Sequence, residues 1–247
     1  MTTTGSKKNR TGTTGNRSRT NPKTTTGKIK LPAIPKILRD LATMDDEPKT
    51  FSIMILDASG SMRSYGDVPQ KCINEYLESL KNPPDGRKQY CTVVVFNDDY
   101  QAIIKPSLAA KVKPITNYCA DGCTLLWETV YKALKNYRAL YGIIQPENLK
   151  IFVGVFSDGQ DNKSFKDRQP RKLKAMAKAV QALGWELFCY GIGIDGKKLA
   201  QDMGFPTDDD HCQTVEANDA GVQATTQHFT AATTTCFHLD PKLFGKK

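Results

Sequence analysis

Residues 51–61 read Phe-Ser-Ile-Met-Ile-Leu-Asp-Ala-Ser-Gly-Ser, and this stretch decides the fold. Its first six residues are mostly apolar, which predicts a short buried strand. Because Asp57, Ser59 and Ser61 alternate with small residues, a tight loop can aim their oxygens at one point. Gly60 supplies the backbone freedom that such a turn needs. The stretch therefore predicts a strand that ends in a loop able to bind a hard cation such as Mg²⁺.

Short apolar runs alternate with amphipathic helical patterns along the rest of the chain. This alternation is typical of an open, mostly parallel sheet that is covered by helices on both faces. We therefore predict an α/β, Rossmann-like doubly wound fold with one antiparallel edge strand. Ligands bind such sheets at the carboxyl ends of the strands. The predicted strands are 51–56, 90–96, 100–104, 149–156 and 185–194, and the predicted helices are 68–80, 124–141, 172–183, 197–203 and 217–234.

The first 30 residues differ in composition from the rest of the chain. They carry eight basic side chains and no acidic one, so of the net charge of +9 only +1 remains on residues 31–247. Because nothing large and apolar precedes Ile29, the segment cannot bury enough surface to fold. We predict a disordered basic tail over residues 1–30, a linker or short helix over 31–49, a domain over 50–236 and a C-terminal tail over 237–247.

The cysteines and the apolar content bear on location. The seven cysteines are scattered through the chain, and no apolar signal segment precedes them, which indicates reduced thiols. Cys119 and Cys123 lack the second pair of ligands that a zinc site requires. The sequence also lacks an apolar run of about 18 residues, the length that crosses a bilayer. These features predict a cytoplasmic protein without a membrane span.

Oxygen-bearing side chains recur at two later places in the predicted fold. Asp121-Gly122-Cys123-Thr124 leads into a predicted helix, and Ser157-Asp158-Gly159 follows the predicted strand 149–156. Together with residues 57–61, these segments resemble the D-x-S-x-S, G-x-T-x-L and T-D-G patterns of the metal-ion-dependent adhesion site in von Willebrand factor A-type domains. The resemblance covers roughly residues 50–236. Two departures are small, since Ser157 stands where Thr is commoner and Cys123 replaces a small or polar residue.

The resemblance implies a metal site with an open coordination position. Ser59, Ser61 and Thr124 would contact the ion directly, and Asp57 and Asp158 would do so directly or through water. Mg²⁺ prefers six oxygen ligands and keeps several waters, and Mn²⁺ or Ca²⁺ would fit the same ligands. An Asp or Glu side chain of a protein partner would fill the remaining position.

Four residues beside the proposed ligands are candidates for contact with a partner. Arg63 and Tyr65 lie just beyond the first loop, and Asp161 and Asn162 follow Asp158 by a few positions. A polar loop at the protein surface would account for Asp161 and Asn162 equally well.

The predicted function is a protein-interaction module, an adaptor in a multiprotein assembly, and not an enzyme. One alternative is a nucleic-acid-associated scaffold, because the basic tail could hold phosphate backbones weakly. However, no aromatic residue interleaves with its basic residues to stack on bases. A second alternative is a metal-dependent phosphoryl- or acyl-transfer enzyme. Against it, Ser59 lacks a G-x-S-x-G context, and a phosphatase of the haloacid dehalogenase type would have an Asp in its place.

Overall fold

The computed structural model describes residues 48–83, 85–141, 148–164 and 169–235, and one six-stranded sheet forms its centre. The strands are β1 (Lys49–Asp57), β2 (Lys88–Phe96), β3 (Tyr100–Leu108), β4 (Leu149–Ser157), β5 (Glu186–Ile192) and β6 (Cys212–Val215). They lie in the order β3-β2-β1-β4-β5-β6. Only β3 runs antiparallel to its neighbour. The predicted α/β, Rossmann-like fold with one antiparallel edge strand is confirmed.

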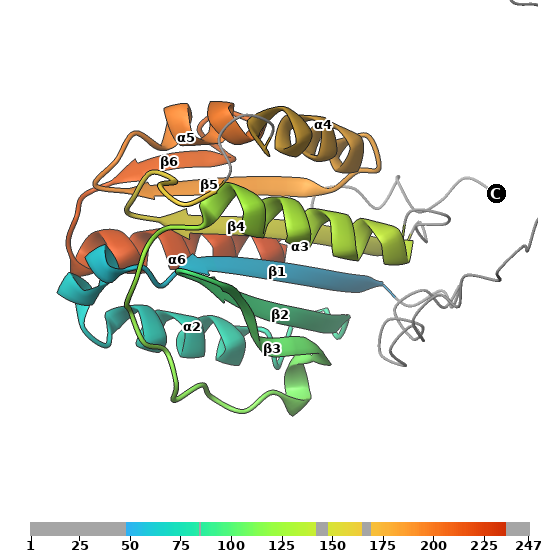
Figure 1. Ribbon diagram of the computed structural model, residues 1–247. Coiled ribbons are helices and arrows are strands. Elements are labelled where there is room, and N and C mark those ends of the chain that lie inside the picture. Colours follow the sequence, from blue (N-terminus) through green and yellow to red (C-terminus); the bar gives the residue numbers. More distant parts are fainter. Residues whose placement is uncertain (1–47, 84, 142–147, 165–168, 236–247) are drawn as a thin grey trace, which may run out of the picture. The chain divides into compact units, whose positions relative to one another are not determined.

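Helices cover both faces of the sheet (Figure 1). The helices are α2 (Val68–Ser79), α3 (Leu126–Tyr141), α4 (Gln169–Gln181), α5 (Gly196–Met203) and α6 (Asp219–Thr235), with short 3₁₀ helices η1 (Gly60–Tyr65) and η2 (Ala109–Lys111). Helices α2 and α6 pack on one face, and α3, α4 and α5 pack on the other. The predicted tails over 1–30 and 237–247, and nearly all of the predicted linker, lie outside the described residues.

Strand β1 is the centre of the core, because every one of its nine residues is buried. Its side chains alternate between the two faces, as the pleat of a strand requires. Ile53 and Ile55 pack with α3 and α4, whereas Met54 and Leu56 pack with α2 and α6. With β2 and β4 paired along its two edges, the strand holds its last residue, Asp57, in a fixed position.

The structure differs from the predicted elements at several ends, including β3, which continues to Leu108 instead of ending at residue 104. Helix α3 begins at Leu126, two residues later than expected, and β5 ends at Ile192. After β5 the chain turns at Gly193, whose φ of 69° lies in the left-handed region that favours glycine. Strand β6, which the sequence did not predict, pairs with β5 over four residues.

The described helices all fall short of the length and apolar character that a bilayer span would need.

Phe229 of α6 anchors that helix to the sheet. Its ring is fully buried, and its centroid lies 5.3 Å from that of Tyr76, 5.6 Å from Phe156 and 5.7 Å from Phe188. Directly beneath it, Gly154 leaves space that a side chain would take, since a Cβ there would lie 2.9 Å from the Phe229 ring.

Replacing Phe229 by alanine should lower the free energy of unfolding by about 3–5 kcal/mol, because the ring leaves a cavity that its neighbours cannot fill. Chemical denaturation measures this change. Gln227 is exposed on the same helix, so Gln227→Ala should change the stability by less than about 0.5 kcal/mol. A similar loss in both variants would show that α6 does not dock through Phe229.

Candidate metal centre

The predicted metal ligands meet at the carboxyl ends of β1 and β4. These strands are parallel neighbours in which Leu56 pairs with Phe156, so Asp57 and Ser157 end side by side. Both are fully buried, and Asp158 follows at the surface of the domain. The register of two central strands therefore brings together residues that lie 100 positions apart in the sequence.

Hydrogen bonds join the first loop to Asp158 in one continuous chain. Asp57 accepts bonds from the Ser59 backbone N–H through Oδ1, at 2.8 Å, and from the Ser157 hydroxyl through Oδ2, at 2.5 Å. The hydroxyls of Ser59 and Ser61 lie 3.1 Å apart, and Ser61 Oγ donates to Asp158 Oδ1 at 2.7 Å. Four of the five predicted ligands are thus in direct contact with another member of the set.

Thr124, the fifth predicted ligand, faces the same space from a third segment. A Cβ built on Gly159 would lie 3.6 Å from Thr124 Oγ1 and 3.9 Å from Ser61 Oγ. Both hydroxyls therefore lie within 4 Å of one point, which the missing side chain of Gly159 leaves open. Asn162 holds Thr124 in place, because its Oδ1 accepts from the Thr124 N–H at 2.9 Å and its own N–H donates to the Thr124 carbonyl at 3.1 Å.

Backbone hydrogen bonds fix the first loop against its neighbours. The Ala58 N–H donates to the Phe96 carbonyl at 2.7 Å, and the Gly60 N–H donates to the Gly122 carbonyl at 3.0 Å. The Tyr118 hydroxyl donates to the Asp57 carbonyl at 2.8 Å. Sequence patterns did not point to Tyr118, because it lies in an irregular segment without a motif.

The donor chemistry fits a hard divalent cation. The cluster offers two carboxylates and three hydroxyls, and oxygen ligands of this kind suit hard cations. Within the described residues, no group of three His, Cys, Asp or Glu side chains gathers as it would at a typical zinc site. The space above Gly159 supplies room beside the hydroxyls.

Comparison with known proteins bears on the fold. The sequence matches no protein-family profile and no curated protein sequence. Among solved structures, the chain is similar to the pilus adhesin SpaC from Lactobacillus rhamnosus GG, with a TM-score of 0.57 and 13% identity over 77% of this chain and 31% of that one. It is also similar to a von Willebrand factor type A structure from Catenulispora acidiphila, with a TM-score of 0.54 and 15% identity over 76% of this chain and 43% of that one.

This chain has the von Willebrand factor A-type (VWA) fold. A third similar structure is proximal thread matrix protein 1 from the mussel byssus, with a TM-score of 0.50 and 15% identity over 76% of this chain and 46% of that one. The chain spans less than half the length of each of these three proteins.

Burial gives the two carboxylates of the candidate site unusual proton affinities. Loss of contact with water raises the pKa of Asp57 from 3.8 to about 6, although bonds from Ser157 and Ser59 oppose the shift. Burial also raises the pKa of Asp158. Within the described part of the chain, no basic side chain pairs with either carboxylate. A buried negative charge without a partner is costly, and a bound cation would remove that cost.

The four candidate partner contacts divide into two exposed and two buried residues. Arg63 is exposed and pairs with Asp121 at 2.7 Å, and Asn162 is exposed beside Thr124. Tyr65 is only 6% exposed and packs into the core. Asp161 is also buried, and its carboxylate accepts from the Trp127 N–H at 2.8 Å at the start of α3. Tyr65 and Asp161 therefore support the VWA site from within instead of facing a partner.

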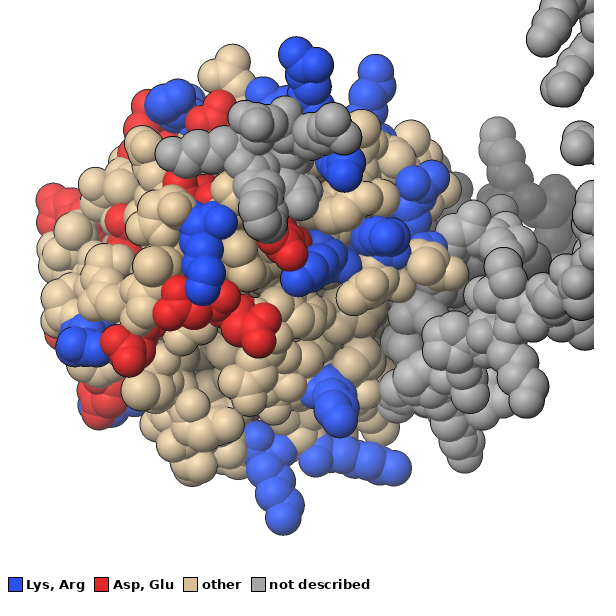
Figure 2. All heavy atoms as spheres, in the orientation of Figure 1, with Lys and Arg blue, Asp and Glu red and all other residues tan. Residues whose placement is uncertain are grey.

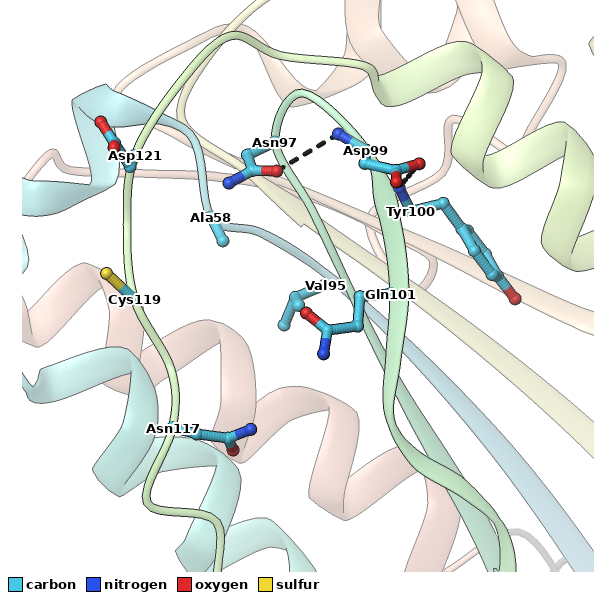
Figure 3. Close-up of a pocket in the computed structure, with 9 residues that line it drawn as sticks. All are labelled: Ala58, Val95, Asn97, Asp99, Tyr100, Gln101, Asn117, Cys119 and Asp121. Atoms are coloured by element: carbon cyan, nitrogen blue, oxygen red, sulfur yellow. Dashed lines mark hydrogen bonds between the residues drawn. The ribbon is translucent and has the colours of Figure 1, made fainter.

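A cavity of about 330 Å³ adjoins the first loop of the VWA site. Figure 3 shows Ala58 of that loop at one side of the space, with Val95 and Gln101 of the β2–β3 hairpin facing Asn117 and Cys119 of the segment that precedes α3. The candidate metal site thus lies beside a polar hollow and not on a flat surface.

Without a cation, the folded domain should become less stable as the pH rises from about 4 to about 6. Below this window Asp57 is protonated in both the folded and the unfolded chain. Above it Asp57 is charged in both, and only the folded chain bears the cost of burial. The cost corresponds to on the order of 3 kcal/mol. Mg²⁺ should therefore raise the melting temperature more at about pH 7.5 than at about pH 5, as measured by thermal unfolding with and without chelator.

Asp57→Asn is the control for this prediction, because it keeps the shape of the side chain and removes its charge. The variant should unfold in chelator without the loss of stability between about pH 4 and pH 6. An equal effect of Mg²⁺ at both pH values in the unaltered protein would mean that the ion does not compete with a proton at Asp57.

Proposed function

We propose that this chain is a protein-interaction module that binds an acidic side chain of a partner through a divalent cation. Asp57, Ser59, Ser61, Thr124 and Asp158 would hold the ion, and Mg²⁺ is the proposed occupant. The observation that carries the proposal is that three hydroxyls and two carboxylates from three loops meet at one end of the sheet, with the Ser61 and Thr124 hydroxyls beside the open space above Gly159.

A bound cation would supply an electrophilic centre that attracts a carboxylate. The residues of this chain hold and shield that centre. Ser59 and Thr124 are buried. They would therefore hold the ion from within and leave the solvent-exposed side of the site to a partner. Among the similar structures, the mussel byssus protein has a zinc-occupied metal-ion-dependent adhesion site, which supports a divalent ion. The oxygen ligands of the present chain favour Mg²⁺, Mn²⁺ or Ca²⁺ over zinc.

Binding without turnover suits the surroundings of the site better than catalysis. Asp57 is fully buried and both of its carboxylate oxygens accept hydrogen bonds, so it is poorly placed to act as a nucleophile. The two described histidines bond elsewhere. His211 contacts Glu186 and Asp208, and His228 contacts Tyr190. A general base would have to come from another residue.

We further propose that the module serves as an adaptor in a cytoplasmic assembly. All six cysteines in the described residues are free thiols, and Cys119 and Cys123 are exposed. Exposed thiols persist most readily in a reducing compartment. Weak binding of polyanions by the basic segment 1–30 stays part of this proposal on the strength of its charge alone.

Ser59→Ala and Thr124→Ala should each weaken Mg²⁺ binding by about tenfold or more, because each removes one ligand oxygen. Isothermal titration calorimetry measures the affinity, and circular dichroism checks that the fold is retained. Ser79→Ala is the matched control, since that serine is exposed at the end of α2. Unchanged affinity in both site variants would remove these residues from the ligand set.

Capture of a partner should depend on the same ion. Proteins retained by the immobilised chain in Mg²⁺ should be released by chelator, and they should fail to bind the Thr124→Ala variant. Mass spectrometry of the two eluates identifies them. If the same proteins bind in chelator and to the variant, the metal centre is not the binding surface.

A further inference from the structure

A groove beside the metal centre runs along β3, the edge strand of the sheet. The cavity of about 330 Å³ at the first loop adjoins a second cavity of about 670 Å³. They share Asn117, and they meet where Gln101 of the first cavity is followed by Ala102 of the second. We call this continuous hollow the β3 groove. Its walls are β3 on one side and residues 111–121 on the other.

The charge of the β3 groove changes along its length. At the end near the metal centre it is lined by Asp99 and Asp121, the latter already paired with Arg63. Its far end is lined by Lys105, Lys111 and Lys113, and by no acidic residue. These three lysines are exposed, and none forms an ion pair with a described residue. Figure 2 shows basic side chains at the bottom of the view, where β3 and the segment after it lie in Figure 1.

The outer edge of β3 is open to a further strand. β3 pairs with β2 alone, and no backbone hydrogen bond joins it to residues 111–121 within the described chain. An edge of this kind offers unpaired N–H and C=O groups that an extended peptide can bind. Ile103 and Ile104 line the groove beside this edge, and so does Ile115 of the opposite wall. Apolar and β-branched side chains of a peptide would find contacts there.

We propose that the β3 groove binds an extended, acidic segment of the same protein partner whose carboxylate reaches the metal centre. This inference rests on the proposed function and adds the chemistry of the partner. The distance along β3 from Tyr100 to Lys105 corresponds to roughly 17 Å at about 3.4 Å per residue. The segment therefore carries its metal-binding Asp or Glu and a second acidic cluster about five residues apart.

Other occupants fit the groove less well. The basic segment 1–30 of this chain and a second copy of β3 would each bring positive charge to Lys105, Lys111 and Lys113. A nucleic acid would satisfy the lysines. However, Tyr100 is the only aromatic residue that lines either cavity, whereas single strands bind on several stacking rings.

Two synthetic peptides of about eight residues test the proposal with the full chain. Each has alternating Thr and Val in its centre, a single Asp at one end and three Glu at the other. The Asp is at the N-terminus of one peptide and at the C-terminus of the other, so that both strand directions are tested. With Mg²⁺ present, one of them should shift the backbone amide NMR signals of residues 101–105 and 111–117. A peptide with three Lys in place of the Glu residues should not. Shifts confined to other residues would overturn the proposal.

Charge reversal supplies the matched variants. K105E/K111E/K113E should weaken binding of the acidic peptide by about tenfold. K172E/K174E/K178E makes the same change of charge on the exposed face of α4, and it should weaken binding by less than about twofold. Equal weakening in the two variants would mean that the net charge of the protein, and not the groove, determines the affinity for the peptide, and it would overturn the proposal. Competition by a single-stranded oligonucleotide at the same amide signals would also overturn it.

Chelator separates this inference from the proposed function. If both proposals hold, chelator weakens binding of the peptide, and the amide NMR signals of the groove residues still shift at a higher peptide concentration. If chelator has no effect while K105E/K111E/K113E still weakens binding, the groove binds the segment and the metal proposal fails. If chelator abolishes binding and the charge reversal changes nothing, the metal centre works alone and the groove proposal fails.

Discussion

A single buried charge organises this domain. The Asp57 carboxylate lies at the end of the central strand, fully shielded from water, where an unpaired negative charge is costly. Two hydrogen bonds, from Ser59 and Ser157, relieve part of that cost. The residue cannot turn toward solvent, because β2 and β4 hold β1 on both edges. The sheet thus maintains a position that favours a cation, and the surrounding loops supply the hydroxyls that would complete its shell.

The segment between η2 and α3 connects the β3 groove to the candidate metal site. It begins at Val112, includes Lys113 of the β3 groove, passes Asn117 and Cys119, and reaches Thr124 at the candidate metal site. Although it contains no regular element after η2, it is well anchored. Asn74 of α2 bonds to both backbone groups of Ile115, at 3.0 and 2.7 Å. A loop held in this way can keep one binding surface in register with another.

The sequence was sufficient to predict most of the sheet and the cluster of oxygen-bearing side chains, because the strands follow local apolar patterns and the polar residues follow the strands. Strong apolar runs mark β1 and β4, and the polar residues that follow them must meet when the strands lie parallel. Strand β6 escaped prediction because its four residues include Gln213 and Thr214 and show no apolar run. Its pairing depends on β5, which is a long-range contact.

The directions in which side chains near the candidate site point could not be predicted from the sequence either. Tyr65 and Asp161 both follow the loops closely, yet Tyr65 packs into the core and Asp161 bonds to the backbone of Trp127 and Ser164. Helix α3 starts later than its apolar pattern suggested because the backbone N–H and C=O of Thr124 are both taken by Asn162.

This pair of hydrogen bonds between Thr124 and Asn162 also has a mechanical consequence. Tension applied through a ligand at Thr124 would pass across two hydrogen bonds to the loop after β4, and from there along the length of a central strand. A tether attached at this point and opposed by a pull at the far end of β4 would load the sheet in shear, the direction in which many parallel bonds share the force.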